Sequence, residues 1–256
     1  MTEIPSYTTA EATNDGWIWQ IPLKKRYGTG YVYSSKFTSD EDAKNNYNQW
    51  LKQNHGVELN DDPRVIHYKP GYYKKNWIGN CLSVGLASGF IEPLESTGLH
   101  IVYNQLQFFV QNNTTLKFLD FDRINYNDFN QKSYLDIFNF ICLHYATNRI
   151  DSPFWEYMTT NKTDWMKAYE EKCSIEFIPT GFARDSQWHI DSYIQVSHGL
   201  EMINVNSVNE FIKNLPKSKK ILEECKKTHD LQATAKSRSR SVPHRSVLNG
   251  SVIIKK

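Results

Sequence analysis

The sequence predicts an α+β protein in which antiparallel strands come first and helices follow. Apolar residues alternate with a period of two in parts of the first hundred residues, and they recur at helical spacing in most of the remainder. The chain has 256 residues, of which 14% are aromatic. A chain of this length with so many aromatic side chains can bury a hydrophobic core, which excludes a disordered protein.

Charge is distributed unevenly along the chain. From Lys217 onward there are 11 basic and 3 acidic residues, whereas residues 1–216 carry 19 basic and 25 acidic residues. An acidic body is not expected to bind nucleic acid. We expect residues 217–256 to form a basic, mobile tail, because the segment has few apolar residues and a run of like charges is usually a solvated end.

Several classes of protein are excluded by what the sequence lacks. No stretch approaches the ~20 apolar residues of a membrane span, and the first residues have neither the basic nor the apolar region of an export signal. We therefore expect a cytoplasmic protein with no membrane partner. The four cysteines lie 61, 31 and 52 residues apart, and no histidine pair has metal-binding spacing. We expect neither a disulfide framework nor a metal site.

The first expected element is a strand over residues 17–22. Trp17, Trp19 and Ile21 share one face of it, and Pro22 ends it because proline has no N–H to donate. Two Trp side chains on one strand face either pack in a core or form an aromatic wall beside a planar ligand such as a flavin or an indole. The pattern alone leaves both alternatives open.

A second strand pattern follows over residues 31–37, so the two strands are expected to form an antiparallel hairpin. We expect Gly28-Thr29-Gly30 to lie in the turn between them. These glycines do not match the GxGxxG dinucleotide fingerprint, because Tyr33 occupies the third glycine position and a strand pattern follows where a helix is required.

A helix is expected from Ser39 to about Gly56, because Ser39 and Asp42 fit a capping box. Its expected inner face comprises Ala43, Tyr47, Trp50 and Leu51. Two further strands are expected, over residues 65–68 and 77–84. Four further helices are expected, over residues 99–110, 134–148, 154–173 and 208–215. His100 and His144 fall on these helices, and we interpret both as hydrogen-bonded packing residues rather than as bases.

The segment from Glu92 to Gly98 precedes an expected helix and combines carboxylates with a potential anion site. A helix N-terminus leaves backbone N–H groups free and carries partial positive charge, so Thr97 and Gly98 can bind an anion. Glu92 and Glu95 then either favour the helix dipole or form a carboxylate beside an anion pocket. Both interpretations are open at this point.

Three blocks of the sequence resemble the flavin-dependent tryptophan halogenases. Trp17-Ile18-Trp19-Gln20-Ile21-Pro22 matches the WxWxIP signature of that family. Residues 80–97, NCLSVGLASGFIEPLEST, resemble its second long block. A weaker third match comprises His144-Tyr145, Arg149 and residues 151–155. Order and spacing are similar to the family over about residues 5–160.

The resemblance implies a chemistry and a set of site residues. In that family, reduced FAD, oxygen and chloride or bromide generate hypohalous acid, which halogenates an aromatic small-molecule substrate, and a separate flavin reductase supplies the reduced FAD. The resemblance places the halide at the backbone N–H groups of Thr97 and Gly98 and gives Glu95 the catalytic carboxylate role. It implies positions next to the flavin or the tunnel for Trp17, Trp19, Ile21 and Pro22, and flavin-binding positions for Gly85, Leu86, Ala87, Gly89 and Phe90.

Two features of the family are missing from this sequence. Neither the FAD-binding GxGxxG motif nor an assignable catalytic lysine is present, and both belong to the family's N-terminal half. We therefore expect a C-terminal portion that is inactive alone. It is either a truncated or split product or a chain that needs a separately encoded N-terminal half as partner. Residues 1–112 are expected to be part of a FAD and halide module in the family's α/β fold, and residues 113–216 a mostly helical substrate-side module.

Two alternative functions remain open on the sequence. One is a component related to flavin monooxygenases, although the intact WxWxIP block and Ser96-Thr97-Gly98 favour halogenation. The other is a non-catalytic remnant or interaction module, which the missing half and the basic tail favour.

Overall fold

The protein was analysed as a computed structural model, which describes residues 7–24, 26–59, 62–113, 115, 117–176, 180–214, 223 and 227. Helices and antiparallel strands are both present, which confirms the expected α+β class. The chain divides into two compact units. Unit 1 comprises residues 1–64, 149–157 and 206–256, and unit 2 comprises residues 65–148 and 158–205.

The bounds of the two units differ from those of the modules that the sequence suggests. The expected modules, residues 1–112 and 113–216, concern functional roles and stay a prediction. The expected tail, residues 217–256, lies outside the described residues apart from Glu223 and Lys227.

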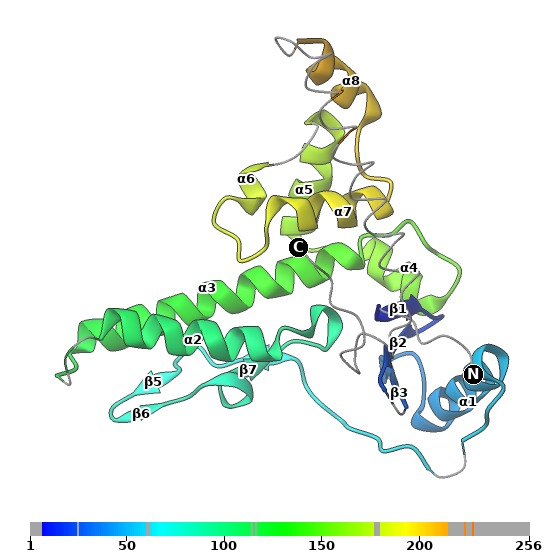
Figure 1. Cartoon of the computed structure of the whole chain (residues 1–256), viewed down its shortest axis with the longest axis horizontal. Helices are drawn as coiled ribbons and strands as arrows, with labels where there is room; N and C mark the ends of the chain where they lie inside the picture. The colour runs from blue at the N-terminus through cyan, green and yellow to red at the C-terminus, as the bar shows by residue number, and fades with distance from the viewer. Residues whose placement is uncertain are drawn as a thin grey trace. The chain divides into compact units, whose positions relative to one another are not determined.

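Unit 1 contains a three-stranded antiparallel sheet in the order β1-β2-β3 (Figure 1). Its strands are β1 (Thr9–Ala12), β2 (Gly16–Pro22) and β3 (Tyr27–Tyr33). The expected hairpin is therefore confirmed, but the expected turn is wrong. Gly28 and Gly30 lie inside β3, and the turn is closed by the Leu23 N–H, which donates to the Arg26 carbonyl at 2.9 Å.

The indole ring of Trp19 explains why a glycine stands inside β3. Trp19 and Gly30 face each other across the β2–β3 ladder. A Cβ atom on Gly30 would lie only 2.7 Å from the indole ring, whereas one on Gly28 would approach no atom closer than 3.4 Å. Gly30 thus provides the space that lets the Trp19 ring lie across the neighbouring strand.

Helix α1 (Asp40–His55) has the caps and the inner face that the sequence predicts. The Asp42 N–H donates to the Ser39 hydroxyl at 3.1 Å, and Gly56 ends the helix in the left-handed conformation with φ 65°. The expected inner residues are all buried: Ala43, Tyr47, Trp50 and Leu51. Three of them, Tyr47, Trp50 and Leu51, pack around Ile18 of β2 as the core of unit 1.

The strands of unit 2 are shorter than expected. Residues 65–68 form no strand, because no described segment pairs with them. The expected strand over residues 77–84 is a tight hairpin of β5 (Trp77–Ile78) and β6 (Cys81–Leu82), because Gly79 adopts φ 57° and reverses the chain. A second two-stranded pair joins β4 (Gly71–Tyr72) to β7 (Gly89–Phe90).

Two short 3₁₀ turns and a set of helices complete the described fold. The turns are η1 (Gly85–Ala87) and η2 (Leu94–Ser96), and the helices are α2 (Gly98–Asn112), α3 (Asp120–His144), α4 (Pro153–Thr160), α5 (Asp164–Ile175), α6 (Thr180–Ala183), α7 (Ile190–Gly199) and α8 (Val205–Asn214). The single helix expected over residues 154–173 is two helices, because Thr163 caps a new one by accepting from the Met166 N–H.

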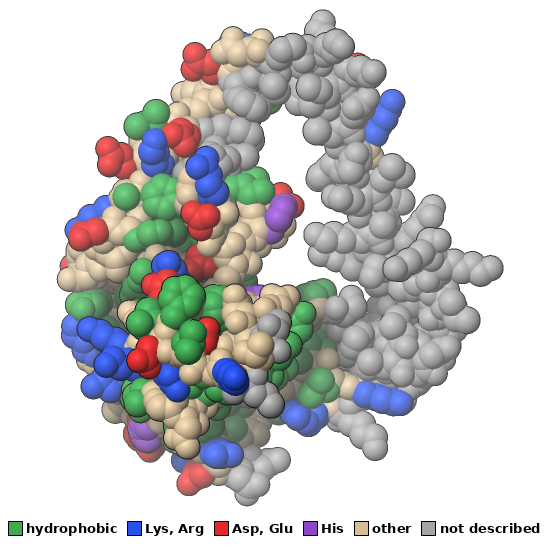
Figure 2. All heavy atoms as spheres, turned by 90° about the vertical axis from the view of Figure 1, so that its left-hand side faces the viewer, with side chains coloured by type: hydrophobic (Ala, Val, Ile, Leu, Met, Phe, Trp, Pro, Cys, Tyr) green, Lys and Arg blue, Asp and Glu red, His purple; other side chains and the backbone are tan. Residues whose placement is uncertain are grey.

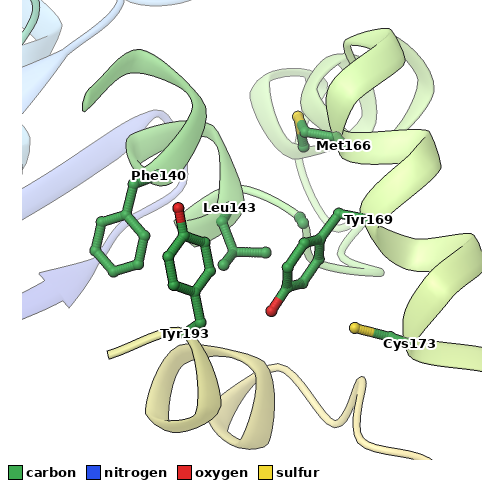
Figure 3. Packing of buried hydrophobic residues seen from close by; sticks show 7 residues of the cluster. Phe140, Leu143, Met166, Tyr169, Cys173 and Tyr193 are labelled. Carbon is green, nitrogen blue, oxygen red and sulfur yellow. The ribbon is translucent and has the colours of Figure 1, made fainter. Parts of the chain in front are cut away.

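The hydrophobic core of unit 2 joins three helices. Figure 3 shows Phe140 and Leu143 of α3 facing side chains of α5 and α7. Their buried partners are Met166, Tyr169, Cys173 and Tyr193. This core supports the C-terminal end of α3, which also carries His144.

Helices α2 and α3 pack along each other (Figure 1), and the contact between them includes a buried polar network. The Gln105 side chain of α2 accepts from the Gly85 N–H at 2.7 Å, donates to the Ser88 hydroxyl at 2.8 Å and donates to the Asn130 amide oxygen of α3. The Ser88 hydroxyl lies 2.7 Å from the Tyr134 hydroxyl of α3. Four side chains therefore fasten the η1 turn to both helices.

This network also decides which side of α2 faces inward. The apolar repeat of the sequence predicts the helix correctly, but Leu99, Leu106 and Val110 of that repeat are exposed. Ile101 and Gln105 are buried instead. The buried amide determines the orientation of α2, since a desolvated amide must find partners.

The steric role of Gly30 can be tested by substitution. Gly30→Ala should lower the free energy of unfolding by about 1–3 kcal/mol, because the added methyl group would lie too close to the Trp19 indole ring, which must shift to make room for it. Urea denaturation followed by tryptophan fluorescence measures the change. Gly28→Ala is the matched control and should change stability less, so an equal loss in the two variants would contradict the explanation.

The Gln105 network can be tested in the same way. Gln105→Ala should lower the free energy of unfolding by about 2–4 kcal/mol, because it leaves more than one buried polar group without its partner. Gln107→Ala, at an exposed position of the same helix, is the control and should have almost no effect. A Gln105→Ala protein as stable as wild type in urea would show that the network contributes nothing.

Candidate functional site

The segment before α2 has an unusual backbone. Glu95 adopts φ 67° and Ser96 adopts φ 53°, so two consecutive residues other than glycine are left-handed. Each such residue costs roughly 1–3 kcal/mol and persists only where its surroundings hold it, which is typical of functional sites. This conformation brings the chain into α2 with Thr97 buried as the residue before the helix.

The start of α2 offers two backbone donors. None of the described residues accepts a hydrogen bond from the N–H of Thr97 or Gly98. The backbone hydrogen bonds of α2 begin with the Ile101 N–H, which donates to the Thr97 carbonyl. The first turn of α2 carries no acidic side chain. Free N–H groups and the positive end of a helix dipole fit a small anion such as a halide.

The Glu95 carboxylate has a partner from α3. His144 Nε2 lies 2.9 Å from Glu95 Oε1, and His144 Nδ1 lies 2.9 Å from the Phe140 carbonyl oxygen. His144 is therefore hydrogen-bonded and packs on Phe140, as expected from the sequence, and Glu95 is a partner that the expectation did not name. A signal was present, because His144 belongs to the weakest of the three similar blocks.

Glu92 is held differently. The Tyr145 hydroxyl lies 3.0 and 3.1 Å from its two carboxylate oxygens and donates to the carboxylate. Burial, with a smaller contribution from the Glu92 charge, raises the pKa of the Cys142 thiol and of the Tyr68 hydroxyl to about 12 each. Glu92 thus accepts from a tyrosine hydroxyl, whereas Glu95 contacts a histidine ring.

The predicted flavin-binding residues form a supported turn in unit 2. Gly85, at φ 61°, and Ser88 are buried, and the Tyr134 hydroxyl donates to the Gly89 carbonyl at 3.1 Å. Leu86 projects outward with 76% of its surface exposed, and Ala87 is also exposed. The turn therefore presents a small apolar edge on a rigid base, which fits contact with a flat cofactor. Phe90 lies in β7, beside the turn.

The predicted tunnel residues lie in β2 of unit 1. Trp17 is buried, and its indole Nε1 finds no acceptor among the described residues. A buried donor without a partner usually indicates a missing ligand or water. Trp19 covers Gly30, whereas Ile21 is exposed at the end of the strand beside Pro22. Trp17 is therefore the residue of this strand best suited to meet an acceptor atom of a bound molecule.

One aromatic residue near the site was missed by the sequence analysis. Trp188 stacks on Phe140, with ring centroids 4.2 Å apart, and Phe140 also contacts the His144 ring at 5.1 Å. The Trp188 Nε1 is a second buried indole donor for which the described residues supply no acceptor. It lies outside the matching blocks, so no motif signals it.

Other kinds of site find no support in the described part of the chain. No cluster of three or more His, Cys, Asp or Glu side chains there could hold a metal ion. None of the described helices is long and apolar enough to span a bilayer. On the face shown in Figure 2, Lys and Arg side chains lie among acidic and hydrophobic ones.

Comparison with known proteins relates this geometry to a family. A sequence profile described as tryptophan halogenase matches residues 1–216. Tryptophan 7-halogenase RebH of Lentzea aerocolonigenes is 35% identical over 154 residues, which are 59% of this chain and 28% of that protein. Tryptophan 6-halogenase SttH of Streptomyces toxytricini is 35% identical over 155 residues, which are 60% of this chain and 29% of that protein. The chain thus spans less than a third of the length of these relatives.

A solved structure supports the same relation over more of the chain. The tryptophan halogenase of Shewanella frigidimarina superposes with a TM-score of 0.82 at 26% identity, covering 97% of this chain and 47% of that one. The strained turn, the two free N–H groups and the WxWxIP strand therefore occur in a chain whose sequence and fold agree with one family. This chain belongs to the tryptophan halogenase family.

Proposed function

We propose that this chain provides the halide site, the catalytic carboxylate and the substrate side of a flavin-dependent halogenase. The observation that carries the proposal is the strained turn at Glu95 and Ser96, directly before Thr97 and Gly98, for whose N–H groups the described residues supply no acceptor. A carboxylate beside an anion site is electrostatically unfavourable, so the arrangement requires a chemical purpose. Family membership supports halogenation as that purpose.

Each residue has a role that its position can support. The N–H groups of Thr97 and Gly98 hold chloride or bromide. Glu95 accepts the proton that an aromatic ring loses when it is halogenated, or orients the halogenating species. Trp17 offers its indole N–H to a bound molecule in unit 1.

FAD would lie along the η1 turn, at Gly85, Leu86, Ala87, Gly89 and Phe90, and when bound would supply the activation of oxygen. The 256 residues contain no GxGxxG motif. We therefore propose that tight flavin binding requires a flavin-binding polypeptide in addition to these residues, and that a flavin reductase supplies reduced FAD. The substrate is an aromatic small molecule.

The proposal predicts which proteins retain flavin and form product. The purified chain alone should retain no flavin, because it lacks a glycine-rich phosphate-binding turn. Co-expressed with the flavin-binding part of a tryptophan halogenase, it should yield a yellow complex. With a flavin reductase, NADH, oxygen and bromide, the complex should halogenate members of a panel of indoles, phenols and pyrroles. Mass spectrometry of the products measures the result.

The same assay separates the alternatives. Hydroxylated product that forms equally with and without halide would favour a monooxygenase-related component. A chain that binds flavin with no added part would contradict the required second polypeptide. A co-expressed pair with neither flavin nor product would favour a non-catalytic remnant or interaction module.

The role of Glu95 predicts a specific loss. Glu95→Gln should reduce the rate of halogenated product formation by about a hundredfold or more, because the amide cannot take up a proton. Flavin content should stay unchanged, since the Glu95 side chain is partly exposed and contacts His144 of α3 rather than the η1 turn. Glu171→Gln, at an exposed position of α5, is the matched control. Wild-type turnover in Glu95→Gln would remove the carboxylate from the mechanism.

A further inference from the structure

One side of α2 exposes a line of large apolar side chains. They follow one another at spacings of four, three and four residues, which places them along one side of the helix over about 16 Å. This spacing is that of a seam against which a second helix packs. All four side chains are exposed, and together we call them the α2 stripe: Leu99, Tyr103, Leu106 and Val110.

The α2 stripe is not interrupted by Asp, Glu, Lys or Arg. The 15 residues of α2 contain none of these four types. The exposed polar neighbours of the stripe include Gln107 and Gln111, whose side-chain amides are neutral. A helix face that meets water normally carries charged residues, whereas the core of a protein interface is depleted of them. The composition of the stripe is therefore that of a face covered by another polypeptide.

The exposed apolar residues of α3 are arranged differently. Ile124 and Leu135 are both exposed, and the helix carries an ion pair between them. The Asp128 carboxylate and the Lys132 ammonium group lie 2.7 Å apart, and both side chains are open to solvent. This face of α3 thus has the mixed composition of a solvated surface, which the α2 stripe lacks.

The α2 stripe lies beside the η1 turn, which carries the proposed flavin contacts. A Cβ atom on Gly85 would lie 2.7 Å from Cγ2 of Val102. Val102 is three residues after Leu99 and four before Leu106, so it borders the stripe on the helix surface. Leu86 of the η1 turn is itself exposed. A polypeptide that holds a flavin against η1 therefore reaches the stripe as well.

We propose that the α2 stripe is the surface on which the flavin-binding polypeptide docks. The choice of this partner rests on the proposed function, in which the chain acts together with a polypeptide that binds FAD tightly. The solved Shewanella frigidimarina halogenase, which shares the fold, has more than half of its chain outside the part that matches this one. That additional part supplies an apolar helix or groove, which packs against the stripe and excludes water from it.

Docking on the α2 stripe also shelters the anion site. The stripe begins at Leu99, directly after the N–H groups of Thr97 and Gly98. A polypeptide that covers Leu99 removes bulk water from the start of α2, and the attraction between backbone N–H groups and a halide is stronger where water is excluded. Assembly of the two polypeptides and protection of the anion site thus depend on the same surface.

Substitution of one stripe residue tests the docking surface. The full chain is co-expressed with the part of the Shewanella frigidimarina halogenase that it does not match, and the complex is quantified after affinity purification. Leu106→Glu should reduce the amount of complex about tenfold or more, because the carboxylate would be buried without a partner. Glutamate is a good helix former and position 106 is exposed, so the variant should fold as wild type does.

Leu135→Glu is the matched control for this variant. Leu135 lies on α3 of the same unit and is 50% exposed, compared with 48% for Leu106. Leu135→Glu should form as much complex as the wild-type chain does. Equal losses in the two variants, a Leu106→Glu chain that assembles normally, or a wild-type chain that forms no complex would each overturn the proposal.

A second measurement needs no substitution, so it holds even if a variant fails to fold. Hydroxyl-radical footprinting with mass spectrometry compares the free wild-type chain with the complex. Tyr103 of the stripe and Phe121 of α3 are exposed to similar extents, 64% and 67%. In the complex, oxidation of Tyr103 should slow about threefold or more, while Phe121 keeps its rate. An unprotected Tyr103, or equal protection of both residues, would contradict docking on α2.

Two further measurements separate this inference from its alternatives. In sedimentation velocity, the chain alone should be a monomer at micromolar concentration. A dimer that Leu106→Glu dissociates and Leu135→Glu does not would assign the stripe to a second copy of the chain and overturn the proposal. A stable complex that forms no halogenated product would disprove the proposed function and leave the docking surface in place. Product formed at the wild-type rate by Leu106→Glu would do the reverse.

Discussion

The side-chain amide of Gln105 is the point on which the arrangement of unit 2 depends. It joins the η1 turn, α2 and α3 through bonds to Gly85, Ser88 and Asn130 in a region without water access. Each of these groups would be costly to bury alone, so the network allows one register of α2 against α3. That register directs the start of α2, and with it Thr97, to its place in the candidate site.

The two glutamates of the preceding turn illustrate how environment separates identical groups. Glu92 is bound by the Tyr145 hydroxyl, a neutral donor, whereas Glu95 meets the imidazole of His144. Both partners come from the end of α3, so this one segment contacts both carboxylates.

The elements that the sequence predicts correctly are those whose signals are local. Ser39, Asp42 and Gly56 delimit α1, since capping residues act within one helical turn of themselves. The predictions that are wrong concern features that depend on contacts between separate segments of the chain. Gly30 is a strand residue because the Trp19 ring lies across it, and residues 65–68 form no strand because no described segment pairs with them. Hydrophobic periodicity describes a single segment, whereas both of these features depend on how two segments meet.

The sequence by itself determined the α+β class, the three blocks that resemble tryptophan halogenases, and the candidate residues Glu95, Thr97 and Gly98. Each of these conclusions depends on residues that are close in the sequence or on the order of motifs, and both can be read before the chain is folded. Only the tertiary structure decided that Gln105 faces inward and that His144, 49 positions from Glu95, contacts its carboxylate. Such contacts depend on how α3 packs against the turn before α2, and helical periodicity carries no information about that packing.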